Sequence, residues 1–182
     1  MAKNKYRTYL VVCIDIPDFD LHVGEFLHPI TRYEFKFGIN NYLHSMNNPK
    51  IPQSLGEIIE HNKSRADIAL KYGQDNLIDV NENTSGTMCE PEYLVALAKR
   101  GAAISIFDAL FSNNKIDVFF MLAGNSGWAA ATGFPCMTIP IGKTSKGLPI
   151  GSYFVARQYA ENTLFNLTYE IEKAIMSCQN IS

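Results

Sequence analysis

Short apolar runs alternate along this chain with longer segments in which apolar residues recur at helical spacing. Four runs rich in branched and aromatic residues, each bounded by turn residues, predict strands near residues 8–16, 116–122, 136–141 and 150–156. The run IDVFFML, residues 116–122, is continuously apolar, which is typical of a strand buried on both faces. The pattern therefore indicates a sheet that needs cover on both sides.

Two capping signatures predict helices in the segment between the first and second strands. Thr31 and Glu34 form a capping box that predicts the start of one helix, and Ser54 with Glu57 repeats the signature for another. The second helix is expected to run toward Gly73, because glycine is suited to closing a helix.

Two further helices flank the three later strands. The longest predicted helix begins near Pro91, a residue suited to the first helical turn. A closing helix is expected over residues 161–176, with its apolar residues on one side. The apolar face of the longest helix consists of Tyr93, Leu97, Ile104, Phe107 and Phe111.

Helices interleaved with apolar strands predict the α/β class, with a partial mixed sheet and covering helices. With 182 residues, the chain fits a single domain over residues 1–182 and has the length to bury a core. Four apolar strands need helices on both faces of their sheet. We expect this chain to supply only part of that cover.

Composition and charge narrow the classes of partner. The content of 47% hydrophobic and 19% charged residues is typical of a soluble globular protein. A net charge of −2 offers no basic footprint, so no nucleic-acid partner is expected. The apolar run from Tyr9 to Ile14 is too short for a secretion signal or a membrane span. We therefore expect a cytoplasmic protein with no membrane partner.

The cysteines and histidines do not form the pattern of a metal or redox site. Cys13, Cys89, Cys136 and Cys178 lie far apart without CxxC spacing, which favours buried thiols over disulfides or a zinc site. No metal ion and no cofactor are expected. The histidines are scattered over predicted turns and helices and suggest no Cys–His or Ser–His pair: His22, His28, His44 and His61.

Three stretches of the second half, KIDVFFMLAG, ATGFPCMTIPIG and KGLPIGSYFVARQYAENTLFNLTYEIEKA, together carry a specific pattern of Gly, Pro and Asp. They resemble the C-terminal part of the amidase signature family of amidohydrolases. That family has an apolar strand after Asp, a strand between Gly-x-Pro and Pro-x-Gly, a Gly-Leu-Pro-x-Gly turn, and a helix opening near Glu and Leu. The matching residues are Asp117, Gly133, Pro135, Pro140, Gly142, Gly147, Leu148, Pro149, Gly151, Glu161 and Leu164.

Two stretches upstream, YEFKFGINNYL and SLGEIIEHN, also resemble the helical region of this family. The resemblance then covers roughly residues 8–175. It implies that the chain adopts the C-terminal part of the amidase signature fold.

Three prolines lie close to the predicted strand ends. Proline lacks a backbone donor, so within a sheet it is confined to edges, strand starts and bulges. Pro135 is expected to start a strand and Pro140 to end it, while Gly147 and Pro149 shape the turn into the return strand. These residues therefore predict a hairpin of two paired strands.

The residues that perform amide hydrolysis in the resembled family are not found in this chain. The family activates a nucleophilic serine through a second serine and a lysine, and a loop rich in Gly and Ser supplies oxyanion donors. This machinery lies N-terminal to the part that is resembled. Ser85, Ser126 and the adjacent Ser145 and Lys146 lack the paired serines and flanking glycines. We expect no catalytic residue in this chain.

The part that is present can still contribute to a substrate pocket. In relatives, the loop between the strand after Asp and the Gly-x-Pro segment approaches the active site. Here that loop carries Asn125, Ser126 and Trp128, which are the candidate pocket residues. Packing of Trp128 as a local anchor is the alternative. The family often has asparagine where this chain has Ala130 or Ala131, so the class of substrate stays open.

Two functions follow from these observations. The first is a truncated C-terminal portion of an amidase, inactive alone, whose complete form hydrolyses carboxamide C–N bonds. The second is a stand-alone structural or interaction module that dimerises or docks on a partner. In both cases, the expected partner is a second copy of the chain or an N-terminal amidase half.

Overall fold

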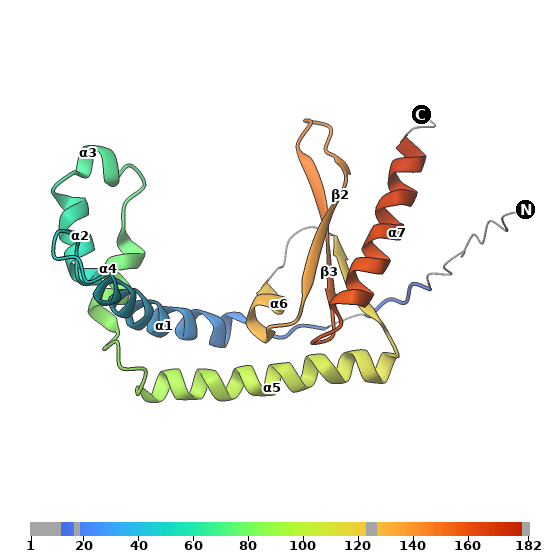
Figure 1. Cartoon of the computed structure of the whole chain (residues 1–182). Helices are drawn as coiled ribbons and strands as arrows, with labels where there is room; N and C mark the ends of the chain where they lie inside the picture. Colours follow the sequence, from blue (N-terminus) through green and yellow to red (C-terminus); the bar gives the residue numbers. More distant parts are fainter. Residues whose placement is uncertain (1–11, 17–18, 123–126, 180–182) are drawn as a thin grey trace, which may run out of the picture.

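A long helix, α5, joins a group of helices at one end of the molecule to a small sheet at the other (Figure 1). The computed structural model describes residues 12–16, 19–122 and 127–179. The helices at the first end precede α5 in the chain, and the strands follow it. The first group comprises α1 (Gly24–Ser45), α2 (Leu55–Lys63), α3 (Ala66–Ala69) and α4 (Asp75–Asn83), and it is followed by α5 (Pro91–Asn114).

Among the described residues, the sheet has three strands in the order β1-β3-β2, with antiparallel pairing at both contacts. In register, Phe119 lies opposite Val155, and Thr138 lies opposite Tyr153. The helix α7 packs on β2 and β3 from one side, while α5 and α6 lie toward the other (Figure 1). The elements of this part are β1 (Val118–Leu122), α6 (Gly127–Thr132), β2 (Cys136–Lys143), β3 (Pro149–Ala156) and α7 (Glu161–Gln179).

The antiparallel helices α1 and α5 are held in register by two crossed hydrogen bonds. The Tyr33 hydroxyl donates to Glu92 Oε2 at 2.8 Å, and the Tyr93 hydroxyl donates to Glu34 Oε1 at 3.0 Å. The two tyrosine rings, both buried, lie 5.8 Å apart between their centroids. A slip of one helix along the other would break both bonds, so the pairs fix the position of α1 on α5.

Three of the four predicted strands are confirmed as β1, β2 and β3. The fourth, predicted over residues 8–16, is wrong for its described part, because residues 12–16 have no regular secondary structure. A strand needs a neighbour for its backbone hydrogen bonds, and residues 12–16 pair with none of the three strands. Residues 8–11 lie outside the described residues.

The prediction that the 116–122 strand is buried on both faces is wrong. Phe119 and Met121 pack against the main core, but the alternate residues Phe120 and Leu122 are 49% and 67% exposed. The cause is the position of α7, which packs on β2 and β3. On that sheet face, Val118 at the start of β1 packs against the cluster beneath α7, whereas Phe120 and Leu122 are left open.

The prolines of the hairpin occupy tolerated positions, with one correction. Pro135 precedes β2 and Pro149 is the first residue of β3, as predicted. Pro140 does not end a strand, because β2 continues to Lys143 after a register shift between Pro140 and Gly142. Since β2 is an edge strand, a residue without a donor is tolerated beside this bulge.

The serine half of one capping box is confirmed, while Glu57 Oε2 accepts the N–H of Gln53, at 2.9 Å, instead of that of Ser54. Ser54 Oγ accepts a hydrogen bond from the Glu57 backbone N–H at 3.2 Å and starts α2. The helix is shorter than predicted, since α2 ends at Lys63 and the chain turns through α3 before Gly73, whose φ is +72°.

The capping box of Thr31 and Glu34 is wrong. The helix α1 begins earlier, at Gly24, and Thr31 Oγ1 donates to the His28 carbonyl inside it. The extra turns are held by the buried Phe26 and Ile30, which are 2% and 5% exposed. In the described part of the chain, no helix is both long and apolar enough to span a membrane.

The predicted burial of the thiols is wrong wherever the structure describes it. Cys13, Cys89 and Cys136 are free and exposed. Cys13 lies in the irregular segment 12–16, Cys89 in the loop before α5, and Cys136 at the start of the edge strand β2. Apolar neighbours in sequence did not imply burial, because an irregular segment, a loop and the start of an edge strand leave these three side chains open to solvent. The side chain of Cys178 lies outside the description.

A close approach between β2 and β3 yields a first prediction. A Cβ on Gly151 would lie 2.8 Å from Thr138 Cγ2, which is closer than two such atoms can pack. Gly151→Ala is expected to lower the free energy of unfolding by about 1–3 kcal/mol through this overlap. Denaturant unfolding measures it, and Thr138→Ala in the same chain should recover most of the loss because Cγ2 is removed.

The matched control for this variant is Gly38→Ala in α1. A Cβ there meets no atom within 4 Å, and alanine is favoured over glycine inside a helix by about 0.5–1 kcal/mol. Gly38→Ala should therefore be neutral or stabilising. Equal losses in the Gly151 and Gly38 variants would contradict the proposed overlap.

Pro149 yields a second prediction. Its fixed φ restricts the conformations of the unfolded chain. Pro149 is the first residue of β3 and lies outside any helix, so its missing N–H removes no helix hydrogen bond. Pro149→Ala is expected to lower stability by about 0.5–1 kcal/mol through greater entropy of the unfolded state. Thermal unfolding followed by circular dichroism measures the change, and a more stable variant would show that proline strains this turn.

Candidate functional site

Trp128, one of the predicted pocket residues, lies in the aromatic core. The short helix α6 places its ring 5.2 Å from Phe19, 5.5 Å from Phe119 and 6.1 Å from Phe107, measured between centroids. The residue is 7% exposed, and its Nε1–H has no hydrogen-bond partner among the described residues. Trp128 therefore packs α6 against α5 and β1, and no other described residue accepts a hydrogen bond from its buried Nε1–H.

The other two predicted pocket residues, Asn125 and Ser126, lie outside the described residues. The structure consequently does not show whether Asn125, Ser126 and Trp128 converge on a substrate. A pocket formed by these three residues stays a prediction.

The segment that leads from α6 to β2 is anchored from α5. Arg100 Nε donates to the Ala131 carbonyl at 2.7 Å, and the Gly133 N–H donates to the Ala129 carbonyl at 2.7 Å. Gly133 has a φ of +76°, which favours glycine and ends the helix. Arg100 was not identified from the sequence, since a basic residue within a helix gives no local signal of a distant carbonyl.

Of the serines considered as nucleophiles, Ser85 has a carboxylate beside it, that of Glu90, but this carboxylate is a weak base, because a hydrogen bond with the Ser85 side chain lowers the pKa of Glu90. Ser85 Oγ lies 2.6 Å from Thr87 Oγ1 and accepts the Thr87 N–H at 3.0 Å, within an exposed turn. Ser145 and Lys146 are exposed in the link between β2 and β3, with no hydrogen bond between them. Ser126 lies outside the described residues. The described geometry gives Ser145 no activating partner, and it gives Ser85 only the weakly basic carboxylate of Glu90.

Tyr153 on β3 is a buried hydroxyl that the sequence analysis did not single out. Burial raises the pKa of its phenol, and a hydrogen bond with the Cys136 thiol raises it further. Tyr153 therefore stays protonated at neutral pH, so its hydroxyl can donate a hydrogen bond but cannot act as a base.

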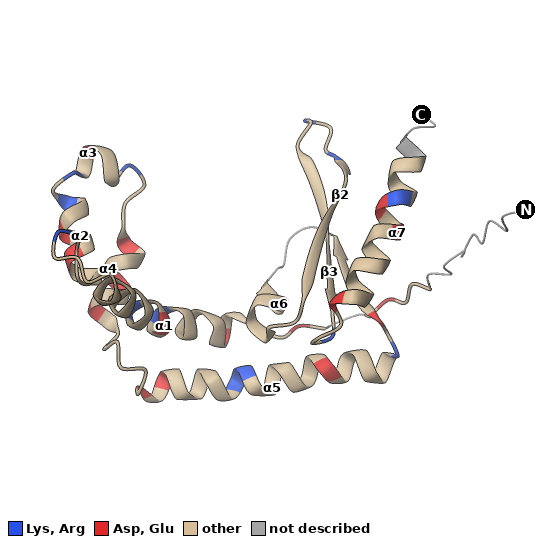
Figure 2. Ribbon diagram, in the orientation of Figure 1, with Lys and Arg blue, Asp and Glu red and all other residues tan. Residues whose placement is uncertain are grey.

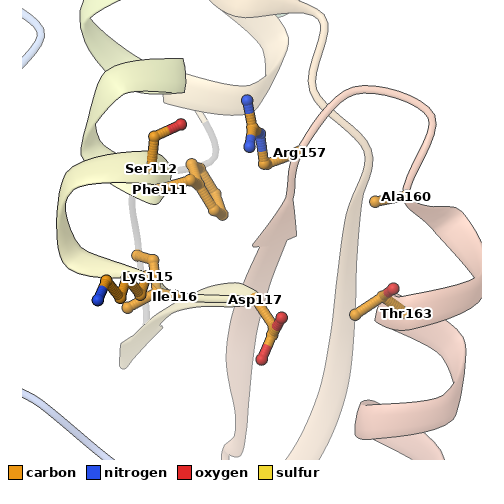
Figure 3. Close-up of a pocket in the computed structure, with 8 residues that line it drawn as sticks. All are labelled: Phe111, Ser112, Lys115, Ile116, Asp117, Arg157, Ala160 and Thr163. Carbon is orange, nitrogen blue, oxygen red and sulfur yellow. The ribbon is translucent and has the colours of Figure 1, made fainter.

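A hollow of about 420 Å³ lies where α5 ends, β1 begins, β3 ends and α7 begins (Figure 3). Phe111 and Ser112 lie on one side of it, and Ala160 and Thr163 lie on the other (Figure 3). Arg157 is engaged by Asp108, with Nε donating to Oδ1 at 2.8 Å and an Nη to Oδ2 at 2.7 Å. The lining is Phe111, Ser112, Lys115, Ile116, Asp117, Arg157, Ala160 and Thr163.

This hollow lacks the groups that hydrolysis needs. Its hydroxyl groups are Ser112 and Thr163, and Ser112 Oγ donates back to the Asp108 carbonyl at 3.3 Å. No histidine or cysteine lines it. Within the described ranges, no cluster of His, Cys, Asp and Glu is arranged to hold a metal ion. The described residues that line the hollow therefore offer no nucleophile paired with a base.

Comparison with known proteins identifies relatives of this arrangement, although no protein-family profile matches the chain. A probable amidase of Arabidopsis thaliana is 27% identical over 146 residues, which are 79% of this chain and 28% of that protein. The peptide amidase of Stenotrophomonas maltophilia superposes with a TM-score of 0.73 at 25% identity, over 85% of this chain and 34% of that structure. An amidase family protein of Bacillus anthracis superposes with a TM-score of 0.70 at 28% identity, over 78% of this chain and 28% of that structure.

These comparisons confirm the predicted fold class, with helices around a partial sheet. The chain spans about one third of the length of the relatives it matches. The relatives are amidases in each case, and the matched extent is consistent with one end of such an enzyme. We conclude that this chain is a homologue of the amidases that corresponds to a portion of them, as expected for a C-terminal portion.

Proposed function

We propose that this chain is the C-terminal portion of an amidase and that it has no hydrolytic activity alone. The observation that carries the proposal is the matched extent, only 28% of the probable amidase and 34% of the peptide amidase. In the complete enzyme, the reaction is hydrolysis of a carboxamide C–N bond. The paired serines and the lysine that the resemblance implies belong to the N-terminal portion.

The chemistry of the described residues supports the claim of inactivity. Amide hydrolysis needs an activated nucleophile and preorganised donors for the oxyanion. Ser85 is hydrogen-bonded to Thr87 and to Glu90, and that hydrogen bonding lowers the pKa of Glu90, so its carboxylate is a weak base. Ser145 lies exposed in the hairpin link. Tyr153 keeps its proton because burial raises the pKa of its phenol. None of these groups can attack a carbonyl carbon.

The role that we assign to this portion is to shape one wall of the substrate pocket. Asn125, Ser126 and Trp128 are the residues proposed for that wall. The buried Nε1–H of Trp128 supports this role, because a donor without a partner among the described residues can donate a hydrogen bond to a carbonyl oxygen of a substrate. The hydrogen bond from Arg100 to Ala131 holds α6 in place beneath it.

A stand-alone structural or interaction module is the second candidate. The exposed Phe120 and Leu122 on β1 favour it, because a monomer rarely leaves neighbouring apolar residues of a strand in water. The two candidates differ in what covers β1: the rest of an amidase in the first, a second copy or an unrelated partner in the other.

We also propose a cytoplasmic location. Cys13, Cys89 and Cys136 are all free and exposed. Exposed thiols persist in a reducing compartment, whereas an oxidising one favours disulfides. The thiol chemistry therefore suits the cytoplasm.

The inactivity yields a third prediction. The purified full chain is expected to show no turnover of small amides or of peptide amides, because no serine among the described residues has a base strong enough to activate it. Release of ammonia or of the product acid, measured over hours at high protein concentration, tests it. Steady turnover that is abolished by Ser85→Ala, Ser126→Ala or Ser145→Ala would contradict the proposal, whereas turnover unchanged in the triple variant would identify a contaminating enzyme.

A further inference from the structure

The chain exposes more surface than a closed protein of its size. Its accessible surface is 12888 Å². To leave out the residues outside the described ranges, we subtract about 160 Å² for each of them, the area of a fully exposed residue, or roughly 3,200 Å² together. A compact protein made of the remaining residues would expose about 8,100 Å². At least about 1,500 Å² is therefore in excess, nearly twice the ~800 Å² that each partner buries in a standard interface.

The two edges of the sheet differ in how they are protected. The edge strand β2 carries Pro140, which has no backbone donor, a bulge before Gly142, and Lys143 at its end. These features are the devices by which proteins prevent a strand from pairing with another chain. The hairpin link also continues directly from this strand. Addition of a further strand at β2 is thus disfavoured.

The opposite edge, β1, has none of these protections. Its sequence VFFML contains no proline, glycine or charged residue, and its pairing with β3 runs without a register shift. Its second edge pairs with no strand in the described part of the chain. On the face that α7 leaves open, Phe120 and Leu122 are 49% and 67% exposed, with the Phe120 ring 5.0 Å from that of Phe154. The unpaired edge and the exposed apolar side chains therefore belong to the same strand, β1.

We infer that β1 is the docking edge for the remaining two thirds of an amidase, which adds a strand to it and covers Phe120 and Leu122. This inference rests on the proposed function, because the partner is the portion that carries the catalytic serines. Strand addition provides backbone hydrogen bonds along the edge, and pockets for alternate side chains provide specificity. Phe120 and Leu122, which are exposed at alternate positions of β1, are the side chains that such pockets would receive.

The size of the excess surface favours this partner over a second copy. Pairing β1 with the β1 of another copy would cover a strand of five residues and the side chains beside it. The excess of at least about 1,500 Å² calls for a larger partner. Relatives about three times as long as the matched extent possess that additional chain.

The test uses the full chain and, as probe, the Stenotrophomonas maltophilia peptide amidase without the third that matches this chain. The two are coexpressed, and the complex is analysed by size-exclusion chromatography with light scattering and by hydrogen exchange. We expect a 1:1 complex in which backbone amides of β1 gain protection while those of β2 do not. Leu122→Lys should weaken the complex at least tenfold, because a charge at this edge opposes strand addition.

Leu148→Lys is the matched control. Leu148 is 62% exposed, close to the 67% of Leu122, but lies in the link between β2 and β3. It should leave the complex unchanged, and both variants should unfold at the temperature of the parent. Absence of a complex, equal sensitivity to the two substitutions, or protection at β2 instead of β1 would overturn the inference.

Two further outcomes are decisive as well. Homodimers that the Leu122 variant dissociates would overturn the choice of partner and assign β1 to self-pairing. A monomer that binds no hydrophobic dye at high concentration would show that the chain closes its own core. Formation of the complex is measured by mass and hydrogen exchange and does not depend on activity. Hydrolysis by the chain alone would refute the proposed function, while the docking inference is tested by the complex itself.

Discussion

The fold depends on one aromatic residue, Phe107, which joins elements that are far apart in sequence. It lies in the second half of α5 and is fully buried. Ring contacts at centroid distances of 5.0–6.1 Å connect it to the segment before α1, to its own helix, to β1, to α6 and to the approach to β2. Such contacts add to the burial of large apolar area. The partners are Phe19, Phe111, Phe119, Trp128 and Phe134.

This cluster makes α5 the axis of the molecule. At one end of α5, the crossed bonds of Tyr33 and Tyr93 position α1, and at the other end Asp108 holds Arg157 at the exit of β3. Few acidic and basic residues mark the sheet compared with the helices (Figure 2). The helical part and the sheet therefore share one support, and both the Trp128 region and β1 are positioned by it.

The hairpin was predictable because its signals are local. Pro135, Pro149 and the glycines between them restrict the backbone at the positions where they stand, so their effect does not depend on distant contacts. The capping boxes show where local reasoning ends. Ser54 starts a helix and Thr31 does not, although both are followed by glutamate at the third position.

The difference between these two sites lies in tertiary packing. Phe26 and Ile30 are buried against the core, and this packing extends α1 past the capping signature and past Pro29. Trp128 illustrates the same limit at the candidate site, since its place between three aromatic rings depends on residues up to 109 positions away in sequence, at Phe19. No local pattern records such contacts. The region of Asn125 and Ser126 lies outside the description, so its part in a pocket rests on the resemblance.

The wrong prediction for β1 is itself informative about function. A continuous apolar run such as VFFML is typical of a strand with neighbours on both faces, yet in this chain Phe120 and Leu122 are exposed. The residue types at β1 thus suit an environment that the described residues do not provide. At β2, by contrast, Pro140 and the bulge suit the edge position that the strand occupies. One strand is adapted to end the sheet and the other to continue it, and this asymmetry is the physical basis for assigning β1 to the missing portion of the enzyme.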